Sequence, residues 1–86
     1  MNQLAAMKET LECAGAMGLL NTSSDNPELD WPHLCDMFER ARIGNYSEAK
    51  LGRHLGWIQC AVVAAGIGLT LEDMKQINLK HSGEPK

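Results

Sequence analysis

The sequence is poor in the features that mark several large classes of protein. Four of its 86 residues are aromatic, and Lys and Arg (8) are outnumbered by Asp and Glu (11). The formal net charge of −3 excludes a generally basic coat for nucleic acid. The most apolar run, residues 57–69, contains Gln59 and two glycines and is shorter than the ~20 residues that span a bilayer. We therefore expect no contact with a membrane.

Cysteine is also sparse, at Cys13, Cys35 and Cys60. Secreted disulfide scaffolds carry dense, even sets of cysteines, which this odd and widely spaced set does not match. Residues 1–9 include an acid and lack the basic start of a signal peptide. These features predict a cytoplasmic protein whose cysteines are reduced and act as small buried hydrophobic residues.

Motifs for catalysis, metals and phosphate are missing. No Cys-x-x-Cys or His-Glu-x-x-His spacing occurs, and His33 and Cys35 stand two residues apart, which places them on different faces of a helix. There is no nucleophile elbow or P-loop, and no predicted strand precedes the Gly66–Gly68 turn as a dinucleotide fingerprint requires. We expect no enzyme activity, no cofactor and no metal.

Apolar residues recur at helical spacing, and no alternating run of β-branched residues predicts a strand. The pattern predicts a single all-α four-helix domain over residues 1–86. The predicted helices cover about residues 3–19, 30–43, 46–65 and 71–81, with a loop at 20–29 and a frayed tail at 82–86.

Local signals mark the ends of these helices. Thr70 followed by Asp73 predicts a capping box for the last helix, and Asn45 followed by Glu48 predicts one for the third. Gly44 is the expected left-handed residue after the second helix. Two further boundaries rest on one residue each, an N-cap at Asp30 and a stop at Gly66.

Small residues recur every four positions in the third helix, at Gly52, Gly56, Cys60 and Ala64. They share one helix face, and each glycine inside a helix costs about 1 kcal/mol relative to alanine. The stripe therefore indicates that another backbone comes close. That backbone belongs either to the first helix of the same chain or to a second copy in a homodimer.

Charge is unevenly distributed. Residues 1–39 carry one lysine and seven acids, whereas residues 40–54 carry four cations and one acid. We define the basic node as the five cationic or titratable residues of the second segment: Arg40, Arg42, Lys50, Arg53 and His54. Internal ion pairs, an acidic protein partner, and a nucleotide or nucleic acid all remain as interpretations.

The acids of the first helix and the following loop form a second set: Glu9, Glu12, Asp25, Glu28 and Asp30. They either keep the protein soluble or imitate a phosphate backbone toward a protein that handles nucleic acid. Trp31 and Trp57 are expected to anchor the core, and an exposed Trp31 would instead indicate a binding hot spot.

Two stretches, EAKLGRHLGWIQ from Glu48 and LTLEDMKQIN from Leu69, carry a resemblance. Residues 45–81 resemble the C-terminal part of small proteins, usually of unassigned function, encoded by bacteriophages and prophages. That group has a Gly-Arg-aromatic-Leu-Gly helix followed by a Thr-Leu-Glu helix, and here His54 replaces the aromatic residue. The resemblance implies a bacterial cytoplasmic setting and an accessory role, and it carries over no site residue.

Together these observations predict a non-catalytic protein–protein interaction module. The resemblance makes it a phage or prophage factor that modulates a host process such as defence, nuclease action or transcription, so that its partner is a host bacterial protein. The alternative is a small nucleotide- or nucleic-acid-binding protein that uses the basic node.

Overall fold

A computed structural model describes residues 1–83 of the chain. Four α-helices are present: α1 (Gln3–Ala16), α2 (Trp31–Ile43), α3 (Glu48–Ala64) and α4 (Leu71–Lys80). Two single 3-10 turns, η1 (Leu19–Asn21) and η2 (Pro27–Leu29), lie in the connection between α1 and α2. No strand occurs in the described part of the chain, which confirms the predicted all-α four-helix fold. The predicted tail at 82–86 falls mostly outside the described residues.

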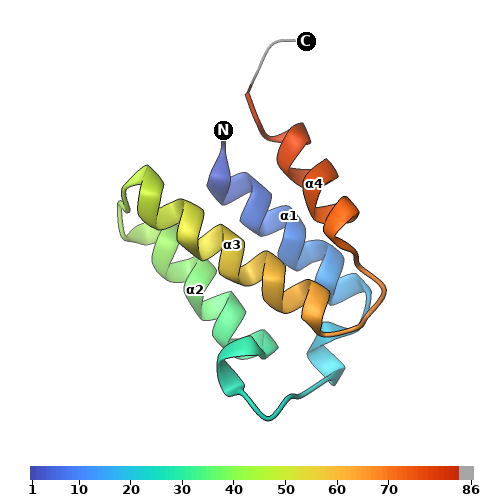
Figure 1. Cartoon of the computed structure of the whole chain (residues 1–86). Helices are drawn as coiled ribbons and strands as arrows, with labels where there is room; N and C mark the ends of the chain where they lie inside the picture. The colour runs from blue at the N-terminus through green and yellow to red at the C-terminus, as the bar shows by residue number, and fades with distance from the viewer. Residues whose placement is uncertain (84–86) are drawn as a thin grey trace.

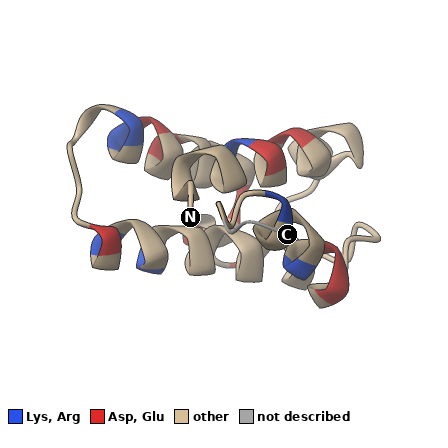
Figure 2. Cartoon of the chain, turned by 90° about the horizontal axis from the view of Figure 1, so that it is seen from above, with Lys and Arg blue, Asp and Glu red and all other residues tan. Residues whose placement is uncertain are grey.

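The helices form a thin slab with Cα dimensions of 38 × 28 × 17 Å. Helix α3 lies across α1 and α2, and α2 runs in the opposite direction to both (Figure 1). Helix α4 packs beside α1. A view from above shows α1 and α2 on one side of the molecule and α3 on the other (Figure 2). Since packed helices lie 8–10 Å apart, 17 Å allows only two layers, and every helix keeps an exposed face.

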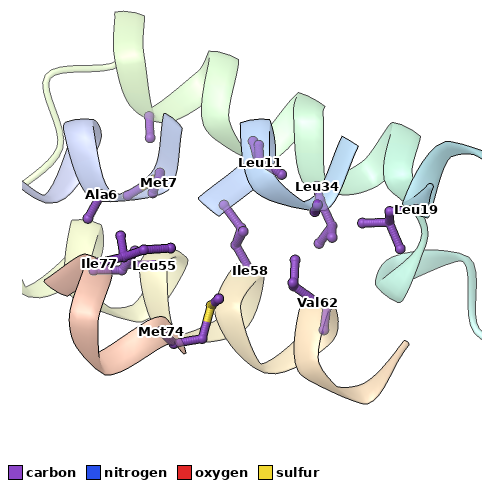
Figure 3. Close-up of a cluster of buried hydrophobic side chains, with 13 residues drawn as sticks. Ala6, Met7, Leu11, Leu19, Leu34, Leu55, Ile58, Val62, Met74 and Ile77 are labelled. Atoms are coloured by element: carbon purple, nitrogen blue, oxygen red, sulfur yellow. The ribbon is translucent and has the colours of Figure 1, made fainter. Parts of the chain in front are cut away.

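All four helices contribute to one hydrophobic core between the layers. Met7, Leu34, Ile58 and Val62 are fully buried, and Met74 closes the α4 side (Figure 3). Burying each such side chain contributes about 1.5–3 kcal/mol. The largest contact is between α1 and α3, so these two helices are the centre of the fold.

Two of the predicted helix ends are confirmed. The Thr70 hydroxyl accepts from the Asp73 amide at 3.1 Å, and the Asp73 carboxylate accepts from the Thr70 amide at 2.8 Å. Gly66 follows the last residues of α3 with φ of +69°, a left-handed conformation that glycine adopts without a steric cost.

The predicted junction between α2 and α3 is wrong in detail. Ser47, not Asn45, is the N-cap of α3, and its hydroxyl accepts from the Lys50 amide at 3.2 Å. The left-handed residue is Asn45 (φ +53°), whereas Gly44 has φ of −88°. Gly44 is required for space, because a Cβ there would lie 2.6 Å from the Arg40 carbonyl oxygen.

Two further boundaries differ from the prediction. Helix α1 ends at Ala16, before residue 19, because Gly18 turns the chain with φ of +91°. Asp30 is the N-cap residue of α2, but its side chain does not cap the helix. Its carboxylate instead accepts from the Ser24 amide and hydroxyl, both at 2.9 Å, and thereby orders the loop.

Candidate functional site

An apolar groove of about 430 Å³ lies between α1 and α2. We call it the α1–α2 groove, and it is lined by residues of these two helices alone: Lys8, Leu11, Glu12, Gly15, Ala16, Trp31, Cys35, Phe38 and Glu39. Its floor is hydrophobic and aromatic, and its three charged residues stand at the helix positions flanking that floor. Concave apolar sites with few polar groups are the usual form of a binding site.

The α1–α2 groove depends on a close contact between Gly15 and Trp31. A Cβ at position 15 would lie 3.2 Å from Cη2 of the Trp31 ring, so glycine allows the indole to approach the α1 backbone. Trp31 is the first residue of α2 and is partly buried against the core. It therefore packs against the core, as expected from the sequence, and it also forms part of the groove wall.

The charges at the groove differ in their pairing. Glu39 accepts three hydrogen bonds from Arg42, the shortest at 2.7 Å, and these bonds lower the pKa of Glu39 and raise that of Arg42. Lys8 and Glu12 are exposed and make no ion pair with another described residue. Two charges of opposite sign, one turn apart on α1, thus remain available to a partner.

Cys35 is a partly buried thiol in the floor of this groove. Burial raises its pKa, and the nearby Glu39 carboxylate raises it further. The thiolate is the nucleophilic form of cysteine, so this environment suits a packing role for Cys35.

The basic node is partly neutralised within α2. Arg40 pairs with Asp36 at 2.8 Å and Arg42 with Glu39 at 2.7 Å, both between exposed side chains. Of the three interpretations, internal pairing therefore describes the two arginines of α2, whose charges are balanced over their own helix (Figure 2).

The rest of the basic node lies on α3. The Lys50 ammonium stands 3.9 Å from the centre of the Tyr46 ring, and the His54 ring packs 5.1 Å from the same ring. His54 Nδ1 also lies 3.1 Å from the Lys50 carbonyl oxygen. Arg53 is exposed and has no ion pair within residues 1–83.

The five acids of the second set do not act alike. Glu9 accepts from Lys80 Nζ at 2.7 Å and lies 2.8 Å from His81 Nε2. Glu12 lines the α1–α2 groove, and the Asp30 carboxylate accepts a hydrogen bond from the Ser24 hydroxyl. Asp25 and Glu28 are exposed in the loop.

The small-residue stripe of α3 faces outward. Gly52, Gly56, Cys60 and Ala64 are all exposed, and no atom outside the local α3 backbone lies within 4 Å of a Cβ built at position 56. At Gly52 a Cβ would lie 3.1 Å from Oε1 of Gln3, the first residue of α1, so this end of the stripe does approach the first helix. The expected crossing through the whole stripe is wrong, because α3 packs on α1 mainly through Leu55, Ile58 and Val62. The prediction that all three cysteines are buried is also wrong, since Cys60 is exposed.

Trp57 likewise differs from the expected core anchor. Its side chain is 40% exposed, and its Nε1 donates to the Glu28 carbonyl oxygen at 3.0 Å. This hydrogen bond connects the η2 turn to the exposed side of α3.

Sequence reasoning missed Gly15 and Leu71 as surface-shaping residues. Gly15 sits in a helix whose apolar spacing looked continuous, although a glycine inside a helix is itself a signal of close packing. Leu71 is 74% exposed at the first position of α4, and no sequence pattern distinguishes it from a core leucine.

No group of three or more His, Cys, Asp or Glu side chains in the described residues is arranged to hold a metal ion. Among the same residues, no helix has the length and apolar character to cross a membrane. The chain matches no protein-family model, and neither a curated protein nor a solved structure is significantly similar to it.

Proposed function

We propose that this protein is a non-catalytic interaction module that binds an amphipathic helix of a partner protein in the α1–α2 groove. The observation that supports this is the apolar floor of Leu11, Trp31, Cys35 and Phe38, which is flanked by charged residues of both signs, among them Lys8 and Glu12. Aromatic residues at such positions are typical binding hot spots.

The dimensions of the groove favour a helix as its occupant. Trp31 and Glu39, which bound it on α2, are eight residues apart and thus about 12 Å along the axis, or two helical turns. Helices that dock in grooves present apolar residues at i, i+4 and i+7 over this length.

The unpaired charges on α1 define the flank of that ligand. Glu12 would form an ion pair with a lysine or arginine on the partner helix, and Lys8, one turn away, would pair with an acid. Charges at the edge of an interface mainly set orientation and the rate of association. The ligand is therefore an amphipathic helix with one cation and one acid beside its apolar stripe.

The resemblance of residues 45–81 to phage and prophage proteins indicates which kind of protein carries the helix that binds in the groove. On that basis we propose a bacterial host protein as the partner and the bacterial cytoplasm as the place of binding. The nucleotide alternative has less support, because both arginines of α2 are already paired with carboxylates.

A peptide titration tests the proposal. The probe is a synthetic helical peptide of about four turns, with leucines at i, i+4 and i+7 and a lysine and a glutamate on one flank. We expect saturable shifts of the α1 and α2 amides and of the Trp31 indole in heteronuclear NMR spectra. A peptide of the same composition in scrambled order is the control, and equal shifts with both peptides would overturn the proposal.

A charge swap sharpens the test. Glu12→Lys should weaken binding of this peptide about fivefold, and exchanging the peptide's lysine for glutamate should restore it. Asp25→Lys makes the same charge change outside the α1–α2 groove and should leave the affinity unchanged. Glu12 is exposed, so its replacement leaves the fold intact.

A further inference from the structure

The outer side of α3 is an apolar face without a partner in the chain. Its centre is formed by Gly56, Cys60 and Ala64, with Trp57 (40% exposed) on one edge and Leu71 of α4 (74% exposed) on the other. We call these five residues the α3 face. Contiguous apolar patches larger than roughly a few hundred Å² are rare on monomeric proteins and mark interaction sites.

A groove of about 410 Å³ runs along this face between α3 and α4. Its lining contains no charged residue and comprises Gly56, Gln59, Cys60, Val63, Ala64, Leu71 and Met74. Leu71 projects beside it, and the capping box of Thr70 and Asp73 fixes the backbone of the first turn of α4, from which the leucine side chain extends. A shallow groove and a projecting leucine therefore lie side by side on one surface.

Opposite charges lie at the two ends of the α3 face. Arg53, exposed and without an ion pair in the described chain, stands one turn before Trp57. At the other end, Ser24 and Asp30 share a cavity with Ala61 and Ala64, which places these two ends of the acidic 24–30 segment beside the end of α3. Glu28, in the middle of the segment, lies beside Trp57 instead. Asp25 follows Ser24 and is exposed.

We propose that the α3 face binds a second copy of this chain in a symmetric dimer with the two α3 helices antiparallel. The two-fold axis passes near the level of Ile58, midway along the stripe from Gly52 to Ala64. Reversing α3 about this axis brings each Arg53 to the acidic 24–30 segment of the other copy. It also brings each Leu71 to the glycine end of the other copy's groove, so one surface supplies both complementary halves.

The charge pattern is what favours a second copy over another protein. A neutral centre with a cation at one end and carboxylates at the other is complementary to itself only when the two copies run antiparallel. The small residues permit close approach of the two α3 backbones, which explains a glycine at position 56, where the chain itself places no atom within 4 Å of a Cβ. The dimer is independent of the proposed function, since no α3 or α4 residue lines the α1–α2 groove.

Sedimentation velocity over a range of about 1 μM to 1 mM tests the dimer. Wild-type protein should shift from monomer to dimer within this range. Gly56→Leu should weaken the dimer at least tenfold and keep the helical circular dichroism, because a side chain at position 56 meets open space. Gln76→Leu, which also adds a leucine at an exposed helix position but lines neither the α3–α4 groove nor the α1–α2 groove, is the control and should dimerise as the wild type does.

A charge exchange tests the antiparallel arrangement. Arg53→Glu and Asp25→Lys should each weaken self-association about tenfold at low ionic strength, because each places like charges at both symmetric contacts. An equimolar mixture of the two variants should form a heterodimer, since both contacts then join opposite charges. Monomeric wild-type protein at the highest concentration, a dimer that Gly56→Leu leaves intact, or a mixture that fails to associate would each overturn the proposal.

Discussion

Glu9 shows how much a single carboxylate can contribute to the position of a helix. It accepts a hydrogen bond from Lys80 and contacts His81, residues at the other end of the described chain. The Asn2 amide donates to the His81 carbonyl oxygen at 2.8 Å in the same region. The start of α1 and the end of α4 are thus joined through polar contacts. The two ion pairs between a carboxylate and an arginine, by contrast, both lie within α2.

The Glu9 contact predicts a dependence of stability on pH. Hydrogen bonds from Lys80 and His81 lower the pKa of Glu9 below its ordinary value of 4.5. The stabilisation is complete above pH 4.5 and is lost as the pH falls through the lower pKa of the folded state. Glu9→Gln should therefore lower the urea midpoint at pH 7, and the difference from wild type should shrink near pH 3.

Glu12→Gln is the control for that experiment, because it makes the same change one turn along α1 at a side chain without an ion pair. It should leave the urea midpoint at pH 7 unchanged. Equal midpoints for Glu9→Gln and wild type at pH 7 would show that the contact contributes nothing to stability.

At the scale of helices, a polar network inside the core fixes α4 against the other helices. Gln59 of α3, 8% exposed, donates to the Thr10 hydroxyl of α1 at 3.2 Å and to Asn78 Oδ1 of α4 at 2.9 Å. Asn78 donates back to Gln59 Oε1 at 3.0 Å, and Thr10 donates to the Ala6 carbonyl oxygen at 2.7 Å. A satisfied network of this kind selects one arrangement of helices, because any other leaves buried polar groups unpaired.

Gln59→Leu tests this network. It removes both bonds between Gln59 and Asn78, so the free energy of unfolding should fall by about 1–3 kcal/mol. Asn78→Leu should do the same, and the double variant should cost less than the sum of the two, because it removes both partners together. Guanidinium unfolding measures all three, and strictly additive losses would contradict the coupling.

At the scale of the whole molecule, the thinness of the slab explains why two apolar surfaces remain open. With two layers of helices, α1 and α2 cover one side of the core and α3 the other, so each helix has an outer face. The α1–α2 groove and the α3 face are lined by different helices. A dimer through the α3 face would hold two α1–α2 grooves together and so raise the avidity for a partner with two copies of the helix.

The rates at which the three cysteines are alkylated test how accessible these surfaces are. Cys60 is exposed, whereas Cys13 and Cys35 are partly buried and the pKa of Cys35 is raised. Iodoacetamide at pH 8 should therefore alkylate Cys60 first and Cys35 last, because the thiolate reacts and access is needed. Peptide mass spectrometry measures the order at low protein concentration, and faster labelling of Cys35 than Cys60 would contradict the orientation of α3.

How far the fold follows from sequence depends on the range of each interaction. The Thr70–Asp73 capping box and the stop at Gly66 involve neighbouring residues, so their sequence signals were sufficient. The α2–α3 junction was misplaced because Asn45 and Ser47 both have the chemistry of an N-cap. In the structure Asn45 takes the left-handed conformation of the turn (φ +53°), whereas Ser47 has the extended backbone of an N-cap.

The sequence by itself thus determined the number of helices, their approximate extent and the all-α class, because periodicity and capping act over a few residues. Only the tertiary structure decided which face of α3 is buried. Residues 61–65 are apolar on every side, so the pattern leaves the rotation of that helix open, and packing of Ile58 and Val62 against α1 and α2 settles it. The same packing turned the small-residue stripe outward and brought Glu9 to His81, since contacts between distant residues depend on how whole helices are placed.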